Sequence, residues 1–265
     1  MFNYCIIIVT LVSKIISIIN QKGGVGKTTT AVNLGAYLAH LGKRVLLVDI
    51  DPQANATSGL GIKHQELDKG VYEAILGISP LHETIQHTVQ ENYKVAPATI
   101  ALAGAGIELV NMSSREFKLE QTLHAIRDEY DYIIVDSPPS LGLLTVNGLV
   151  AADEILIPIQ SEYFALEGLG HLLHTISLVQ NGLKPSLGIM GAVITMYDSR
   201  NRLSHEVMNE LYQYFPNKVF RTVIPRSVKL AEAPSFGRSI LHYDPYSRGA
   251  RAYEKLAREV IDLEK

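Results

Sequence analysis

Cysteine is almost absent from this sequence, and its scarcity excludes several kinds of site. Cys5 is the only cysteine among 265 residues. No disulfide can therefore form within one chain, and one chain cannot build a metal site from several cysteines. Such cysteine usage is typical of proteins from a reducing compartment such as the cytosol.

The sequence also lacks an excess of basic residues. Lys and Arg number 24 against 27 Asp and Glu, which gives a formal net charge of -3. The chain as a whole thus gives no indication of nucleic-acid binding, and any such function must depend on local charge. Hydrophobic residues make up 47% and charged residues 19%, a balance that is typical of a globular protein with a sizeable core.

A long uninterrupted apolar run is the third missing feature. The most apolar stretch, residues 1–19, contains Lys14 and is shorter than the run of about 20 apolar residues that a membrane span needs. It also lacks the basic start and the small-residue cleavage site of a signal peptide. We therefore expect a cytoplasmic protein without a membrane span.

Short apolar runs alternate with helical patterns along the chain. The runs are continuously apolar, as in parallel strands whose two faces are both buried, and they lie at 15–19, 44–50, 131–136, 154–159, 187–195 and 218–224. Helical patterns occupy 28–41, 113–129, 164–180, 203–215 and 247–263, and Ser113 with Glu116 predicts a capping box. This order predicts an α/β fold in which one doubly wound, mostly parallel sheet is flanked by helices. Neither a linker nor a repeat divides residues 13–265, so we expect a single domain.

A glycine-rich loop, KGGVGKTT at 22–29, follows the first strand. The usual phosphate-binding loop begins with a glycine five residues before its Gly-Lys pair, but that position is Gln21 here, and a second lysine, Lys22, precedes the glycines. In such a loop the backbone N–H groups and the helix N-terminus face phosphate oxygens. Lys27 is predicted to reach the β- and γ-phosphates, and the Thr28 hydroxyl to hold Mg²⁺. The rest of the predicted nucleotide site is Gly23, Gly24, Val25, Gly26 and Thr29.

Three aspartates stand where predicted strands end. Asp49 and Asp51 close the second strand, at the carboxyl edge where open α/β sheets bind their ligands. Carboxylates beside phosphates can hold the water shell of Mg²⁺ or orient an attacking water; a helix cap or an exposed carboxylate is the alternative for each. Asp136 ends another apolar strand as a Walker B aspartate does, so we predict that it binds Mg²⁺ directly or through water.

Four segments together carry a family resemblance. KGGVGKTTT, VDIDPQANATSGLG (48–61), YIIVDSPPSLG (132–142) and RTVIPRSVKLAEAPSFG (221–237) closely resemble the ParA/Soj partition ATPases. These belong to the deviant Walker A group of P-loop NTPases, with MinD, the nitrogenase iron protein and the arsenite-pump ATPases. The resemblance implies ATP and Mg²⁺ as ligands, ATP hydrolysis and an ATP-dependent homodimer.

The resemblance also implies roles for individual residues. Lys22 is the signature lysine, which reaches the phosphates held by the other subunit and acts in catalysis with Lys27. Asp51 positions the attacking water, whereas Asp49 supports the metal or the loop. The backbone at Pro225 and Ser227 contacts the adenine.

Basic residues gather in the last third of the chain. Between positions 200 and 258 there are eleven basic and five acidic residues, a local balance of 11 − 5 = +6. A surface of this kind binds DNA phosphates without reading the base sequence. The resemblance assigns this role to Arg200, Arg226 and Lys229. Solvated helix faces and internal ion pairs are the alternative.

The resemblance implies a nucleoid-associated switch that dimerises with ATP, binds DNA non-specifically and hydrolyses ATP slowly. A ParB/Spo0J-like protein bound to centromere-like DNA would accelerate this hydrolysis and so drive chromosome or plasmid segregation. The alternative is a MinD-like ATPase that cycles on the membrane; it needs a basic amphipathic tail, and the sequence ends in the mixed-charge REVIDLEK. An iron–sulfur carrier is excluded because Cys5 lies outside the matched region.

Residues 1–12 precede the region that resembles the family. They are apolar and have no helical or strand period of their own. We expect them to be a surplus extension, or the result of a start codon assigned too early.

Overall fold

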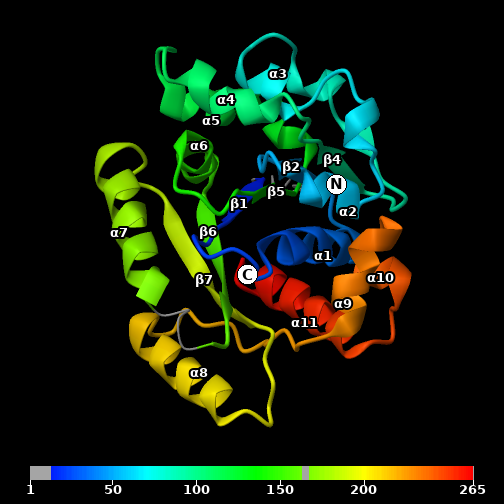
Figure 1. Ribbon diagram of the computed structural model, residues 1–265, viewed down its shortest axis with the longest axis vertical. Coiled ribbons are helices and arrows are strands. Elements are labelled where there is room, and N and C mark those ends of the chain that lie inside the picture. The colour runs from blue at the N-terminus through cyan, green and yellow to red at the C-terminus, as the bar shows by residue number, and fades with distance from the viewer. Residues whose placement is uncertain (1–12, 163–166, 265) are drawn as a thin grey trace, which may run out of the picture.

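A seven-stranded sheet forms the centre of the protein (Figure 1). The structure is a computed structural model that describes residues 13–162 and 167–264, so the predicted extension at 1–12 lies outside the described residues. The strand order is β3-β4-β2-β5-β1-β6-β7, and β3 pairs antiparallel to β4 while all the other pairs are parallel. This confirms the predicted fold class. The strands are β1 (Lys14–Ile18), β2 (Val45–Asp49), β3 (Gln86–His87), β4 (Tyr93–Ala96), β5 (Tyr132–Asp136), β6 (Glu154–Gln160) and β7 (Gly188–Thr195).

Helices cover both faces of the sheet (Figure 1). Helices α1 and α11 pack on one face, and α4 to α8 contribute to the core on the other. The helices are α1 (Lys27–His40), α2 (Asn55–Gly59), α3 (Val71–Ile75), α4 (Leu102–Leu109), α5 (Lys118–His124), α6 (Leu143–Ala151), α7 (Glu167–Gly182), α8 (Arg202–Tyr214), α9 (Val228–Glu232), α10 (Ile240–Tyr243) and α11 (Arg248–Asp262). None of the helices in the described ranges is long and apolar enough to cross a membrane.

The continuous apolar runs of the sequence supply two cores at once. Successive residues of a strand point to opposite faces of the sheet. Leu47 accordingly packs in the core beneath α1 and α11, and its neighbours Leu46 and Val48 pack in the core beneath the other helices. All three side chains are fully buried.

The segment 218–224 is not a regular strand, which corrects the prediction from its apolar character. It runs beside β7 but forms only isolated bridges, such as Ala192 with Val219. The backbone N–H groups of Arg221 and Thr222 donate to the Glu259 carboxylate at 2.7 and 3.1 Å. These donors are used by α11, and backbone pairing with β7 resumes at Ile224, whose N–H donates to the carbonyl oxygen of Ile194 at 2.8 Å.

The helix predicted over 113–129 is also shorter than expected. α5 covers only Lys118–His124, with single 3₁₀ turns before and after it. The predicted capping box does not form: the Glu116 carboxylate accepts from Arg115 Nε at 2.9 Å, and Ser114 takes a left-handed φ of 50° before the 3₁₀ turn. The short strand β4, in which Lys94 interrupts the apolar pattern, was not predicted at all.

Three neighbouring strands end at the same level. In the parallel register, Asp136 at the end of β5 lies opposite Ile18 of β1 on one side and Asp49 of β2 on the other. The glycine loop follows β1, so the topology brings the loop and two predicted carboxylates to one edge of the sheet.

Candidate nucleotide site

The glycine loop takes a conformation that requires glycine at two of its positions. Gly24 and Gly26 have φ of +75° and +89°, in the left-handed region that residues with a side chain rarely adopt. Val25 between them is buried, and its carbonyl oxygen accepts a hydrogen bond of 2.8 Å from Thr195 Oγ1 at the end of β7. The loop is thus anchored to the sheet, and α1 starts directly after it at Lys27.

Lys27 is held within the loop. Its side chain is buried, with 7% of the residue exposed, and its Nζ donates to the carbonyl oxygen of Lys22 at 3.1 Å. Burial lowers the pKa of Lys27, and the negative charges of Asp136 and Asp51 act in the opposite direction. An ammonium group that is shielded from water and makes no ion pair among the described residues is well placed to receive an anionic ligand.

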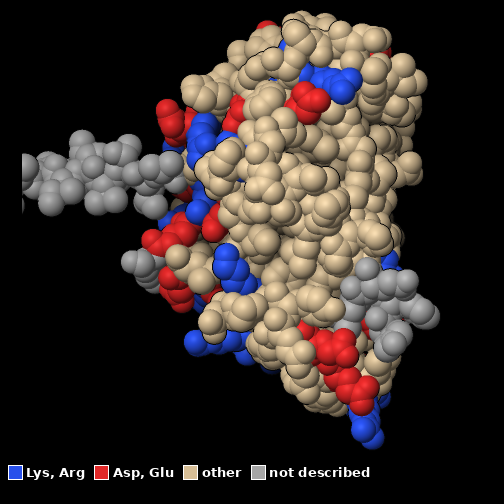
Figure 2. All heavy atoms as spheres, turned by 90° about the vertical axis from the view of Figure 1, so that its left-hand side faces the viewer, with Lys and Arg blue, Asp and Glu red and all other residues tan. Residues whose placement is uncertain are grey.

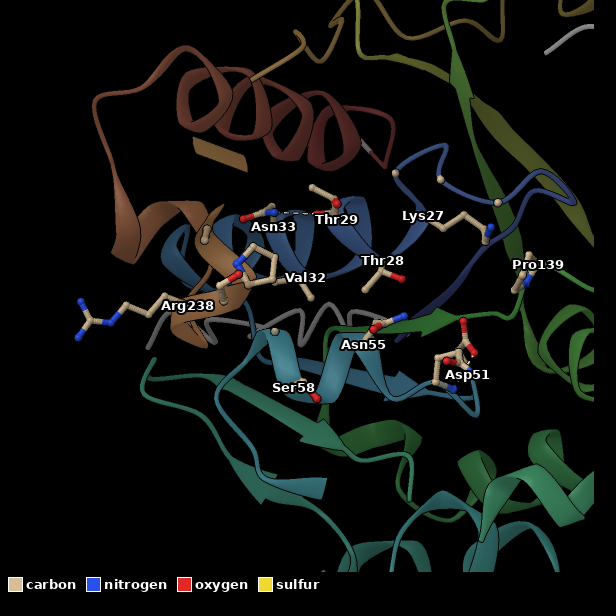
Figure 3. A pocket seen from close by; sticks show the side chains of 18 of the residues that line it. Lys27, Thr28, Thr29, Val32, Asn33, Asp51, Asn55, Ser58, Pro139 and Arg238 are labelled. Atoms are coloured by element: carbon tan, nitrogen blue, oxygen red, sulfur yellow. Dashed lines mark hydrogen bonds between the residues drawn. The ribbon is translucent and has the colours of Figure 1, made fainter. Parts of the chain in front are cut away.

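A cavity of about 590 Å³ opens beside the loop. Figure 3 shows that Lys27, Thr28, Asp51 and Pro139 lie toward one end of it and that Arg238 lies at the other. The cavity is further lined by residues that sequence reasoning did not single out, namely Asn33, Asn55, Ser58, Met196, Ala233, Pro234 and Ser235. Its volume and its mixture of polar and apolar lining residues suit a phosphorylated ligand with a ring system.

Asp136 is the most unusual group at this edge. It is fully buried, and neither carboxylate oxygen accepts a hydrogen bond from the described residues. Burial raises the pKa of Asp136 well above its usual value, and the negative charge of Asp49 raises it further. Thr28 lies near enough to lower this pKa, but not in hydrogen-bond geometry. A buried carboxylate without a partner is costly, so the arrangement suits a cation at this position.

The chemistry of these donors fits Mg²⁺. The described residues contain no group of three or more His, Cys, Asp or Glu that could hold a metal by themselves. Further ligands would therefore have to come from a hydroxyl such as that of Thr28, from water or from a phosphate. Mg²⁺ favours this mixture of hard oxygen ligands and keeps several of its waters.

Asp49 at the end of β2 and Asp51 just after it make different contacts. Asp49 Oδ2 accepts from the backbone N–H and the hydroxyl of Thr57, at 2.8 and 2.7 Å, and Oδ1 accepts from the Asp51 N–H at 3.1 Å. These hydrogen bonds tie Asp49 to the segment 51–57 that follows β2. Burial raises its pKa to about 6 against these hydrogen bonds. Asp51 instead lines the cavity and accepts from the Gln53 N–H at 2.9 Å.

Lys22, the extra lysine, does not line the cavity. Its Nζ lies 3.4 Å from Oε2 of Glu162, which follows the end of β6. The Glu162 carboxylate also accepts from Gln160 Nε2 at 2.6 Å and lies 3.5 Å from an Arg226 nitrogen. No local sequence pattern indicates Glu162, because it lies 140 positions after Lys22.

Pro225 and Ser227 line a second, smaller cavity of about 180 Å³. Gly26, Thr29 and Met196 line both cavities, so the two lie side by side at the start of α1. Met196 follows β7 directly. Its place at a strand end is the signal that could have identified it from the sequence.

The three predicted DNA-binding residues lie apart from the main cavity, and each pairs with an acid. Arg200 makes two hydrogen bonds to Asp198, at 2.9 and 2.8 Å. Arg226 lies 3.5 Å from Glu162. Lys229 lies 3.0 Å from Glu232 and 5.6 Å from the centre of the Tyr243 ring. Asp198 lies just outside residues 200–258, so the balance of +6 exceeds the free positive charge of this surface.

Comparisons with known proteins agree with this geometry. An AAA domain family matches residues 13–189. The sporulation initiation inhibitor protein Soj of Bacillus subtilis strain 168 is 57% identical over 93% of this chain and 98% of its own length. The chromosome partitioning protein ParA of Myxococcus xanthus is 53% identical over 94% and 88%. A solved structure of cobyrinic acid a,c-diamide synthase from Mycobacterium smegmatis, with a bound ATP analogue and magnesium, is 38% identical and has a TM-score of 0.83 over 93% of each chain.

Proposed function

The chain belongs to the ParA/Soj family of partitioning ATPases, and from this premise we propose that it is an ATP-driven switch in DNA segregation. It hydrolyses ATP with Mg²⁺ in the cavity beside the glycine loop. The observation that carries this proposal is Asp136, a buried carboxylate without a hydrogen-bond partner among the described residues, at the same strand edge as Lys27 and Thr28.

Each part of the site has a task in this reaction. The N–H groups of the glycine loop and the Lys27 ammonium hold the phosphates, and Thr28 and Asp136 hold Mg²⁺, which neutralises phosphate charge when bound. Asp51 orients the water that attacks the terminal phosphate, and its hydrogen bond from Gln53 keeps the carboxylate in place. The adenine lies toward the part of the cavity formed by Met196 and the segment that begins at Pro225.

The position of Lys22 supports a dimeric active form with slow hydrolysis in the single chain. Lys22 lies outside the cavity of its own chain and is paired with Glu162. One chain alone therefore lacks one cation at its phosphates. A lysine on the rim of the loop is suited to reach the nucleotide of a second copy, where it would offset the charge of two ATP molecules.

DNA and a second protein complete the proposed cycle. The ATP dimer binds nucleoid DNA in the cytoplasm without sequence preference. A ParB/Spo0J-like protein accelerates ATP hydrolysis and so releases the dimer from the DNA. The +6 balance of residues 200–258 supports the DNA part. The names of the relatives, Soj and ParA, favour this cycle over a MinD-like cycle on the membrane.

Phosphate release by the purified chain is the direct test. We expect Mg²⁺-dependent ATP hydrolysis that rises at least about tenfold when both duplex DNA and the ParB-type protein of the same organism are added, a change of about 1.4 kcal/mol in the barrier. Asp136→Asn should raise the Mg²⁺ concentration needed for half-maximal activity. A chain that hydrolyses no ATP, with or without these additions, would contradict the proposal.

A further inference from the structure

Helix α11 has two sharply different faces. Tyr253, Leu256 and Val260 are at most 1% exposed in the core beneath the sheet. On the opposite side a basic stripe is exposed, and we define it as Arg248, Arg251, Lys255 and Arg258. Their spacing of three, four and three residues places them within about 80° of the helix circumference, along about 15 Å of its axis.

Most of this basic stripe carries free positive charge. Arg248, Arg251 and Lys255 make no ion pair with any residue in the described part of the chain, and only Arg258 pairs with an acid, Glu254, at 2.8 Å. This contrasts with the three predicted DNA-binding residues, each of which faces a carboxylate of its own chain. The stripe is therefore the less neutralised of the two basic surfaces.

Neighbouring acids cancel only part of the charge of the stripe. The Glu259 carboxylate accepts the backbone N–H groups of Arg221 and Thr222. Glu254 is paired with Arg258. Asp262 lies one turn beyond Arg258 and ends the stripe at the C-terminal end of α11.

The basic stripe begins next to the segment that carries Arg226 and Lys229. Gly249 packs so closely on α9 that an added Cβ would stand 2.7 Å from Leu230 Cγ. Tyr253 of α11 lines the same small cavity as Arg226. In Figure 1, α9 and α11 lie together on the side of the sheet away from α4 to α7. The face around α7 offers no comparable surface: Figure 2 shows it as largely uncharged.

We propose that the basic stripe of α11 binds the phosphate backbone of duplex DNA and extends the surface at Arg226 and Lys229. This inference rests on the proposed function. Exposed Lys and Arg side chains contact phosphates without reading bases. A membrane is a poorer fit, because a helix that lies on a membrane must insert apolar side chains, and those of α11 pack in the protein core.

Charge reversal on the stripe tests the inference. The variant combines Arg251→Glu with Lys255→Glu, and the control combines Lys63→Glu with Lys69→Glu, which changes the charge equally at exposed lysines between α2 and α3. Binding of the full chain with ATP and Mg²⁺ to a random-sequence duplex is followed over a salt titration. We expect the variant to lose at least about tenfold in affinity and about two units of salt slope, since each phosphate contact contributes about 0.9.

The control should stay within about twofold of the unmodified chain, and basal ATP hydrolysis should be unchanged in both. The charge-conserving pair Arg251→Lys and Lys255→Arg should retain binding, because phosphates respond to charge. If the double variant fails to fold, Arg251→Gln and Lys255→Gln singly should each remove about one unit of salt slope.

The outcomes separate this inference from the proposed function. If the variant binds DNA as tightly as the control does, the inference that the stripe binds DNA is refuted, and the proposed function is unaffected. Absence of DNA binding by the unmodified chain would overturn both. Unchanged DNA binding with lost binding to phosphatidylglycerol vesicles would overturn the inference and assign the stripe to a membrane.

Discussion

Lys22 and Glu162 form an ion pair within one chain, with 3.4 Å between Nζ and Oε2. The two side chains are 34% and 45% exposed, and pairs of this exposure contribute about 0–1 kcal/mol. The pair can therefore hold Lys22 away from the cavity and still be replaced by a stronger anion. A phosphate group on a second subunit is such an anion, so we propose that the pair is a resting position for the lysine.

Lys22→Gln should abolish the ATP-dependent dimer and leave nucleotide binding intact. The substitution removes the cation but keeps the backbone carbonyl, which accepts from Lys27. Light scattering with ATP and Mg²⁺ reports the dimer, and nucleotide affinity is measured in parallel. Lys63→Gln, on an exposed lysine far along the chain, is the control. A normal dimer in the Lys22 variant would refute a role for this lysine across the interface.

Glu162→Gln should favour the dimer, because it removes the charge that holds Lys22. The expected effect is a decrease of up to about fivefold in the ATP concentration at half-dimerisation, the equivalent of about 1 kcal/mol. Glu83→Gln, which removes the partner of exposed Lys69, provides the matched control. Weaker dimerisation than in that control would show that Glu162 assists the dimer.

Asp51→Ala should trap the ATP dimer. The carboxylate orients water in the transition state and contributes little to binding of the nucleotide, so turnover should fall at least about tenfold while DNA binding persists. Single-turnover phosphate release is the measurement. A rate within about twofold of the unmodified chain corresponds to less than 0.5 kcal/mol in the barrier, and it would exclude this role.

Arg200→Glu and Asp198→Asn should change DNA affinity in opposite directions. The first reverses the charge of Arg200, and the second removes the carboxylate that accepts two side-chain hydrogen bonds from it. We expect weaker binding for Arg200→Glu and an increase of a few-fold for Asp198→Asn, both diminishing at high salt. Competition titrations with duplex DNA measure both. Equal affinities for the two variants would place Arg200 outside the DNA surface.

Much of the nucleotide site is readable from the sequence because it depends on local chemistry. Gly24 and Gly26 adopt positive φ in the structure. A glycine-rich loop between a strand and a helix already predicts such backbone conformations. Asp51 and Asp136 follow apolar runs, so their place at the carboxyl edge comes from strand direction alone. The parallel sheet is also predictable, because few other architectures bury both faces of continuously apolar strands that alternate with helices.

Only the tertiary structure decides which distant partners these residues meet. Lys22 pairs with Glu162, which lies 140 positions further along the chain. The Glu259 carboxylate accepts hydrogen bonds from the backbone N–H groups of Arg221 and Thr222, where the sequence predicts a strand. The same holds for charge: the sequence predicts a basic surface, but the carboxylates that face Arg200, Arg226 and Lys229, and the scarcity of such partners along α11, depend on packing. Side-chain pairing depends on distances in space, and these become fixed only when helices and strands far apart in the chain pack against one another.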